Sequence, residues 1–208
     1  QMNESHYEFL CRLAELSGCF FYISLGKLYF TSVSELQSDG VTLTPDIGIH
    51  ELNVTTSVWG QLKEVTHVSL DPKDFTKKIQ SKVTSSSITK YGDGKASTSL
   101  TSNISASCAR HIVDYSIASV AEAKFRSEAL YNRTAIDLVK GKFLVAGIPD
   151  ITVASGLKTS GYGQPIDNTY IITEIIHHCD IANSKFTTEI SASSSKVNPL
   201  TASLLSLF

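Results

Sequence analysis

Residues Asn3 to Phe30 constrain the fold more than any other part of the chain, because they combine a capped helix with a β-hairpin. Asn3 or Ser5 can accept hydrogen bonds from the free amides of a first helical turn, and Ser5 and Glu8 have the spacing of a capping box. Gly18 is suited to end the helix in a left-handed conformation. Apolar residues recur between these caps at helical spacing, at Phe9, Leu10, Leu13 and Leu16. The sequence therefore predicts one amphipathic helix.

The residues that follow this helix favour two β-strands joined by a turn at Gly26. Aromatic and β-branched side chains dominate both strands, over Cys19–Ile23 and Leu28–Phe30, as is typical of a half-buried hairpin. We expect three residues to form a core between the helix and the hairpin, namely Phe9, Leu13 and Phe21.

The order of these features resembles the late-control D and VgrG family, the hub proteins of contractile phage tails and type VI secretion spikes. Members carry an Asn-Glu-Ser-x-x-x-Phe-Leu helix, an Arg-Leu-Ala segment and a Gly-aromatic-aromatic strand followed by Gly-Lys-Leu. The corresponding residues here are Asn3, Glu4, Ser5, Phe9, Leu10, Arg12, Leu13, Ala14, Gly18, Phe20, Phe21, Gly26, Lys27 and Leu28. Two later stretches also resemble the family, Val65–Lys73 with its Asp-Pro end and the closing strands between Gly141 and His177.

The resemblance implies an α+β fold, with a small helix-plus-hairpin domain followed by a mainly antiparallel β-barrel with one crossing helix. We expect the small domain at 1–58, the second hub barrel at 59–195 and an apolar tail at 196–208, which is expected to dock on protein surface. The family would treat Gln1 as the middle of a longer protein, so a fragment without the N-terminal barrel is expected.

The resemblance also implies a function: a structural hub subunit that joins a tail or secretion tube to its piercing spike. It implies a homotrimer whose partners are the tube protein, a spike or spike domain and other baseplate proteins. The protein would assemble in the bacterial cytoplasm and end in a virion tail or a secreted injection particle. No enzymatic activity, cofactor or small-molecule substrate is expected.

The composition is consistent with a structural hub subunit and disfavours nucleic acid and anionic membranes as partners. The 208 residues are 42% hydrophobic and only 18% charged, so much of the surface is neutral, which suits a subunit covered by neighbours. The formal net charge of −2 gives no electrostatic basis for binding nucleic acid or an anionic membrane.

The middle of the chain alternates between regular and irregular stretches. Ile49–Val58 is predicted to be a strand that leaves the small domain, and the Ser-rich stretch 79–109 is predicted to be an exposed loop or a ragged edge hairpin. A helix is predicted over 117–133, where Ser119 and Glu122 have capping-box spacing. Short apolar strands with glycine turns follow, in the pattern of an antiparallel barrel or sandwich.

The densest group of possible metal ligands is the run His177, His178, Cys179 and Asp180. Consecutive residues of a strand face opposite sides, so at most two of these share a face, which is too few for zinc. We expect His177 to be a hydrogen-bonded structural residue. The four cysteines, Cys11, Cys19, Cys108 and Cys179, show no C-x-x-C pattern, and we expect buried or half-buried thiols in a reducing compartment.

Other motifs that suggest chemistry are incomplete. Gly92-x-Gly94-Lys95 lacks the spacing, preceding strand and following helix of a phosphate-binding loop. No Gly-x-Ser-x-Gly nucleophile motif occurs in the sequence. Two pairs of carboxylates have structural explanations. In the pair Asp71 and Asp74, Asp71 is expected to end a strand, and Glu4 and Glu8 are expected to stabilise the positive end of a helix. The sequence thus predicts no catalytic, cofactor or metal site.

A second function class stays open at this stage. The hairpin aromatics Phe20, Phe21, Tyr22, Tyr29 and Phe30 could instead form the site of a ligand-binding β-domain, such as an adhesin or carbohydrate-binding module. Aromatics at alternating hairpin positions are more often core residues, and the absence of basic neighbours disfavours base stacking.

Overall fold

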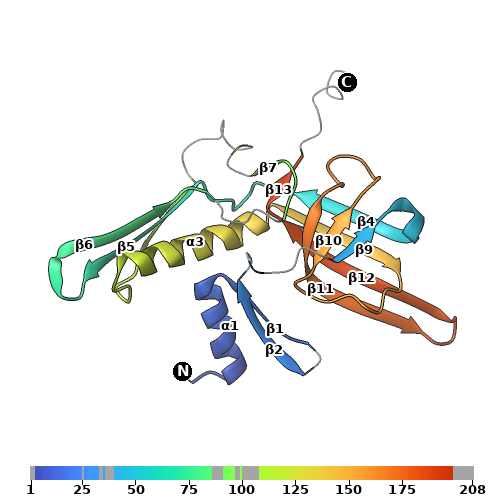
Figure 1. Cartoon of the computed structure of the whole chain (residues 1–208), viewed down its shortest axis with the longest axis horizontal. Helices are drawn as coiled ribbons and strands as arrows, with labels where there is room; N and C mark the ends of the chain where they lie inside the picture. The colour runs from blue at the N-terminus through green and yellow to red at the C-terminus, as the bar shows by residue number, and fades with distance from the viewer. Residues whose placement is uncertain are drawn as a thin grey trace, which may run out of the picture. The chain divides into compact units, whose positions relative to one another are not determined.

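The computed structural model describes residues 3–24, 26–32, 35, 40–85, 91–96, 99 and 108–198. The chain forms two compact units that interleave along the sequence (Figure 1). Unit 1 contains residues 1–36, 59–89 and 101–135, and unit 2 contains residues 37–58, 90–100 and 136–208. No helix within the described ranges has the length and apolar character needed to cross a membrane.

Unit 1 begins with helix α1, His6–Ser17, which has the predicted caps. The Ser5 Oγ accepts a hydrogen bond from the Glu8 amide at 3.2 Å, and the Glu8 carboxylate accepts one from the Ser5 amide at 2.8 Å. Gly18 ends the helix at φ +63°, in the left-handed region that glycine adopts without a steric penalty. The capped amphipathic helix predicted from the sequence is therefore confirmed.

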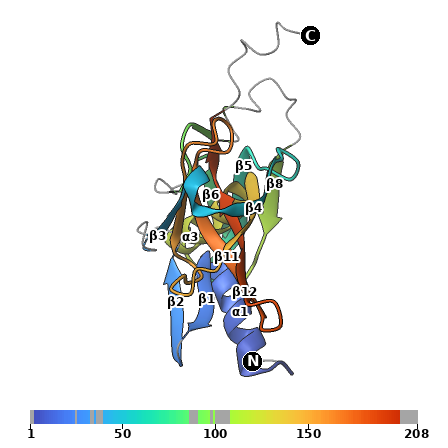
Figure 2. The ribbon, with the colours of Figure 1, turned by 90° about the vertical axis from the view of Figure 1, so that its right-hand side faces the viewer.

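Strands β1, Cys19–Ser24, and β2, Lys27–Ser32, form an antiparallel hairpin beside α1 (Figure 2). The Tyr22 and Tyr29 rings stack at 4.8 Å, and the Tyr7 ring of α1 lies 5.5 Å from the Phe21 ring. The expected core trio of Phe9, Leu13 and Phe21 is only half-buried, and Ala14 is the buried residue of the helix. A two-stranded hairpin covers too little of a helix to bury the large side chains fully.

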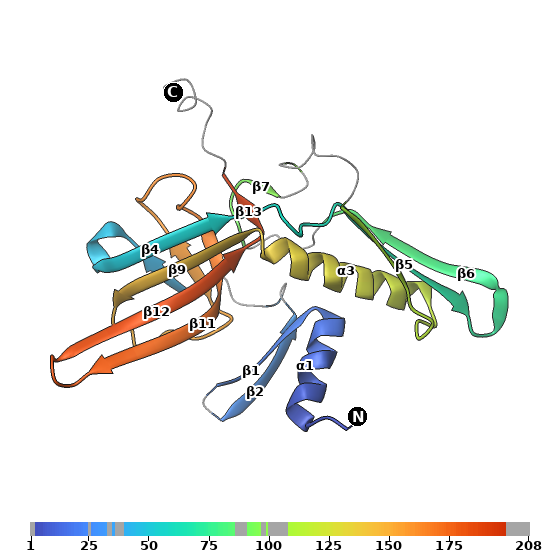
Figure 3. The ribbon, with the colours of Figure 1, turned by 180° about the vertical axis from the view of Figure 1, so that it is seen from behind.

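The rest of unit 1 is a three-stranded sheet covered on one face by a helix (Figure 3). The elements are β5, Glu64–Asp71; β6, Asp74–Val83; β8, Ala109–Val113; and α3, Val120–Ile136. The strand order is β6-β5-β8, with β6 antiparallel and β8 parallel to β5. Buried side chains of α3 and the sheet form one cluster, Val65, Val83, Tyr131 and Ala135.

Helix α3 begins and ends three residues later than the predicted range of 117–133. The Glu122 amide donates to Ser119 Oγ at 3.1 Å, so the predicted capping contact forms and the helix starts after it. Ile117 is fully buried before the helix begins, and its apolar character extended the predicted range too far. The helix expected to cross a barrel packs on the three-stranded sheet of its own unit.

Unit 2 is built on a curled six-stranded sheet with the order β3-β10-β11-β12-β9-β4. Its strands are β3, Gly40–Leu43; β4, Ile49–Thr56; β9, Val139–Ala146; β10, Gly156–Thr159; β11, Thr169–Asp180; and β12, Lys185–Ser194. Neighbouring strands are antiparallel except β3 and β10. Phe143 and Tyr170 are fully buried at its centre, with ring centroids 5.6 Å apart. The α+β fold class with a barrel-like sheet is confirmed.

The units do not follow the expected division into residues 1–58 and 59–195. Strands β3 and β4, expected in the small domain, pair with β10 and β9 of unit 2. Leu52 and Val54 of β4 pack against the unit 2 core, because strands this short must find apolar partners elsewhere in the chain. A short 3-10 turn, η1 at Pro45–Ile47, connects the two strands.

The Ser-rich stretch 79–109 also contains more regular structure than predicted. Strand β6 continues to Val83, and strand β7, Lys95–Ala96, pairs with β13, Lys196–Val197. The remainder of that stretch, at 86–90, 97–98 and 100–107, lies outside the described residues, as does the apolar end of the chain at 199–208.

Candidate functional site

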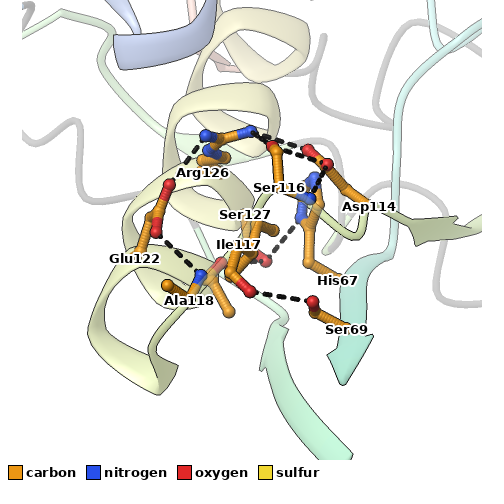
Figure 4. Close-up of polar contacts among 10 residues, drawn as sticks. His67, Ser69, Asp114, Ser116, Ile117, Ala118, Glu122, Arg126 and Ser127 are labelled. Atoms are coloured by element: carbon orange, nitrogen blue, oxygen red, sulfur yellow. Dashed lines mark hydrogen bonds and ion pairs between the residues drawn. The ribbon is translucent and has the colours of Figure 1, made fainter. Parts of the chain in front are cut away.

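A cluster of buried polar side chains in unit 1 lies between β5 and α3 (Figure 4). The His67 Nδ1 lies 2.9 Å from Ser127 Oγ, and this hydroxyl donates to the Ala123 carbonyl at 2.8 Å. Because a serine hydroxyl has one proton, we assign the donor role in the first contact to His67 Nδ1. Burial lowers the pKa of His67, which favours the neutral imidazole.

Arg126 organises the loop that leads from β8 into α3. Its guanidinium contacts the Asp114 carboxylate at 2.6 Å, the Glu122 carboxylate at 2.7 Å and the Ser116 hydroxyl at 3.0 Å. The hydrogen bond from the Ser116 side chain is the main cause that lowers the pKa of Asp114. The Ser69 hydroxyl of β5 donates to the Ile117 carbonyl at 2.8 Å, so the same loop is also tied to the sheet.

This cluster has the residue types of a hydrolase site but the environment of a structural one. The Ser127 side chain is fully buried and His67 is only 5% exposed. The Asp114 carboxylate is paired with Arg126 and Ser116, while the described partner of His67 Nδ1 is Ser127. A substrate would have to displace α3 to reach the serine, so the arrangement fixes the helix on the sheet.

Beside this cluster lies a groove of about 410 Å³ within unit 1. Helix α1 lines it with Arg12 and Leu16, and α3 lines it with Leu130 and Arg133. Strand β8 contributes Arg110 and Ile112, while Glu15, His67, Asp114 and Arg126 complete the lining. The groove thus combines an apolar strip with four guanidinium groups.

Three of the four arginines have acidic partners. Arg12 contacts Glu4 at 2.7 Å, Arg133 contacts Glu15 at 2.9 Å, and Arg126 is paired as described above. Arg110 is exposed and forms no ion pair with any residue that the structure describes. Arg110 is therefore the arginine of the groove that is available to pair with an anionic group of another molecule.

The residues of the His-Cys-Asp run lie along the solvent-exposed end of β11. The His177 Nδ1 lies 3.0 Å from Thr188 Oγ1, and its ring stacks on Phe186 at 5.6 Å. The Asp180 carboxylate accepts from the Asn183 amide at 3.2 Å and so shapes the turn to β12. No group of three or more metal-ligating side chains occurs within the described ranges.

All four cysteines are free, but their burial differs from the expectation in one case. Cys11, Cys19 and Cys108 are half-buried, whereas Cys179 is exposed. Cys179 lies in the part of β11 that extends beyond the buried core, where neither face of the strand is covered.

The Gly92-x-Gly94-Lys95 sequence serves close packing. Gly92 has φ +116°, and a Cβ at this position would lie 2.6 Å from the Lys196 amide nitrogen of β13. Tyr91 is fully buried beside it, and the Asn168 side chain accepts from the Asp93 amide at 2.8 Å. The glycines allow this segment to approach β13, which accounts for their presence without a phosphate.

The two carboxylate pairs also have local structural partners. Asp71 accepts from the Lys73 amide at 2.8 Å, and Asp74 accepts from the Thr76 amide at 3.1 Å, so both shape the turn between β5 and β6. Glu4 pairs with Arg12, and Glu8 completes the cap of α1.

Comparison with known proteins gives structural matches alone. No protein-family profile and no curated protein matches the sequence. The fold is similar to the 43 kDa tail protein of prophage MuSo2 from Shewanella oneidensis, with a TM-score of 0.67 and 18% identity over 94% of this chain and 56% of that one. It is also similar to a tail protein from Neisseria meningitidis, with a TM-score of 0.62 and 12% identity over 93% of this chain and 55% of that one.

A third match is a chain of the virion of a native gene transfer agent particle. Its TM-score is 0.55 and its identity 11%, over 93% of this chain and 40% of that one. The chain therefore spans about half the length of the first two structures and less of the third. At these identities the likeness shows a shared fold.

Proposed function

We propose that this protein is a structural component of a phage-type tail. The proposal rests on the likeness of the fold to two tail proteins. The two structural matches cover 94% and 93% of this chain. The cluster around His67 agrees with a structural role as well, because the buried Ser127 hydroxyl of α3 contacts His67 of β5 and so ties the helix to the sheet.

More specifically, the protein acts as a hub subunit that joins a tail or secretion tube to its spike in a contractile injection system. Support comes from the resemblance of residues 3–30 to the late-control D and VgrG family, in the part of the chain where the capping box and hairpin form. The full-length protein is then a homotrimer that contacts the tube protein, a spike and other baseplate proteins. It assembles in the bacterial cytoplasm and ends in a virion tail or injection particle.

The competing ligand-binding role draws no support from the hairpin geometry. Tyr22 and Tyr29 stack on each other, which covers one face of each ring, and Phe21 makes tilted contacts with Tyr7 and Phe30. These are the contacts of a hairpin that packs on its helix, and they do not align the rings into one flat platform. Glycan binding to the purified protein would nevertheless separate the two roles, since the hub role predicts no saturable sugar ligand.

Gene deletion and complementation test the proposal. Deletion in the producing strain should abolish assembled tails, and the wild-type gene should restore them. Multi-angle light scattering of the full-length protein should give the mass of a trimer at micromolar concentration. Normal tails in the deletion strain would refute the tail role, whereas normal dependence on the gene with a stable monomer would refute the trimeric hub alone.

A further inference from the structure

We propose that the arginine-lined groove of unit 1 is a docking site for a segment of another protein chain that carries carboxylates interspersed with apolar side chains. The groove is concave, and its volume of about 410 Å³ accommodates several side chains of a partner. Its location within a single compact unit means that one copy of the protein supplies the whole site.

The charge of the lining selects an acidic occupant. Four arginines line the groove, and three of them pair with the carboxylates of Glu4, Glu15, Asp114 and Glu122, so the charge of Arg110 is the one left without an ion pair among the described residues. The Arg12 and Arg133 side chains remain 48% and 54% exposed in their ion pairs, and Arg110 has no ionic partner among the described residues. Guanidinium groups favour carboxylates because they present paired donors in a fixed plane.

The apolar strip selects a polypeptide over a nucleic acid. Leu16 is 43% exposed, and Ile112 and Leu130 are half-exposed within the same groove. A partner that covers these side chains removes apolar surface from water, which stabilises the complex. The carboxylates of Glu15 and Asp114 would repel a continuous line of phosphates, whereas a peptide can place its acids beside Arg110 and Arg12 alone.

The stretches of this sequence outside the described ranges do not supply an acidic segment, because Asp39 is their one residue with a carboxylate side chain. Arg110 and Ile112 lie on the same face of β8, because they are two residues apart in a strand. This spacing suits an extended or helical segment with an acidic and an apolar side chain on one face.

The test uses the purified chain and a fluorescein-labelled synthetic peptide of alternating glutamate and leucine. Arg110→Glu reverses the free charge of the groove, and Lys78→Glu is the matched control in the same unit. Lys78 precedes Ile79, which is buried on the α3 side of β6, so Lys78 lies on the opposite face of the sheet. Circular dichroism establishes that both variants are folded.

Fluorescence anisotropy should show saturable peptide binding that weakens with rising salt. Arg110→Glu should weaken binding about tenfold or more, while Lys78→Glu leaves it unchanged. In nuclear magnetic resonance spectra, the amide signals of Arg110 and Ile112 should shift on titration. The absence of saturable binding, an equal effect of both variants, equal binding of a lysine-leucine peptide, or tighter binding of single-stranded DNA of matched charge would overturn the proposal.

Discussion

Gly18 provides a direct test of how α1 packs on α3 in unit 1. It has φ +63°, and a Cβ added there would lie 2.8 Å from the Cα and 2.9 Å from the Cβ of Ala129. The left-handed conformation costs an alanine about 1–2 kcal/mol. Overpacking against the helix adds about 1–3 kcal/mol, because the nearest atom belongs to the backbone and cannot rotate away. Gly18→Ala should therefore destabilise unit 1 by about 2–5 kcal/mol in total.

Gly26 is the matched control for the conformational part of this cost. Its φ of +73° is similar, but a Cβ at this position meets no atom within 4 Å. Gly26→Ala should thus cost only about 1–2 kcal/mol. The change in unfolded-chain entropy is the same for both substitutions, so the difference between them isolates the contact with Ala129.

Urea unfolding of the full chain, followed by circular dichroism at the helical minimum, measures both variants. Helix α1 and nearly all of α3 belong to unit 1, so this signal reports on that unit. A double-mutant cycle with Ala129→Gly should recover part of the Gly18→Ala loss. Equal losses for Gly18→Ala and Gly26→Ala, with no coupling to Ala129, would refute the packing of α1 on α3.

Three further predictions concern single side chains. Phe143→Ala should cost about 3–5 kcal/mol because Phe143 is fully buried in unit 2, whereas Ile181→Ala, at a side chain of the same unit that is 92% exposed, should stay within about 0.5 kcal/mol when urea unfolding is followed by the nuclear magnetic resonance signals of unit 2 amides. Ser5→Ala removes the cap of α1 and should cost about 1 kcal/mol, and an unchanged midpoint would contradict the capping role. Burial lowers the pKa of His67, so the unfolded chain binds more protons and stability should fall as the pH drops below about 6.5, by at most about 1.4 kcal/mol per pH unit. Urea midpoints at mildly acidic and neutral pH measure that loss, and His67→Gln should reduce it; an equal loss in the variant would exclude His67 as its source.

The local features of the fold could be predicted from the sequence, because their causes lie within a few residues. The capping box of Ser5 and Glu8 and the left-handed conformation of Gly18 involve neighbours along the chain, and both form as predicted. The start of α3 was misplaced because Ile117, although apolar and buried, belongs to the loop before the helix. Burial and helicity are separate properties that one apolar residue cannot distinguish.

The pairing of distant strands could not be predicted in the same way. Leu43 is fully buried, and its sequence context indicates a strand, but nothing near it indicates that β3 pairs in parallel with β10. The parallel pairing of β8 with β5 likewise depends on which apolar faces meet in the folded chain. Interleaved units of this kind are set by tertiary packing, which a local pattern does not encode.

The groove was missed by sequence analysis for the same reason. Its arginines come from α1, β8 and α3, at positions 12, 110, 126 and 133, and form no run or motif in the sequence. By contrast, Gly92 and Gly94 resemble part of a phosphate-binding motif in the sequence, whereas in the structure they allow their segment to pack closely against β13.

We propose above that this protein is a structural part of a phage-type tail. Electron cryomicroscopy of tail particles purified from the producing strain tests it most directly. We expect density that fits the β6-β5-β8 sheet with α3 and the six-stranded sheet of unit 2, in three copies, where the tube meets the spike. A complete particle whose tube-to-spike junction is built from other proteins, with no density for this fold, would contradict it.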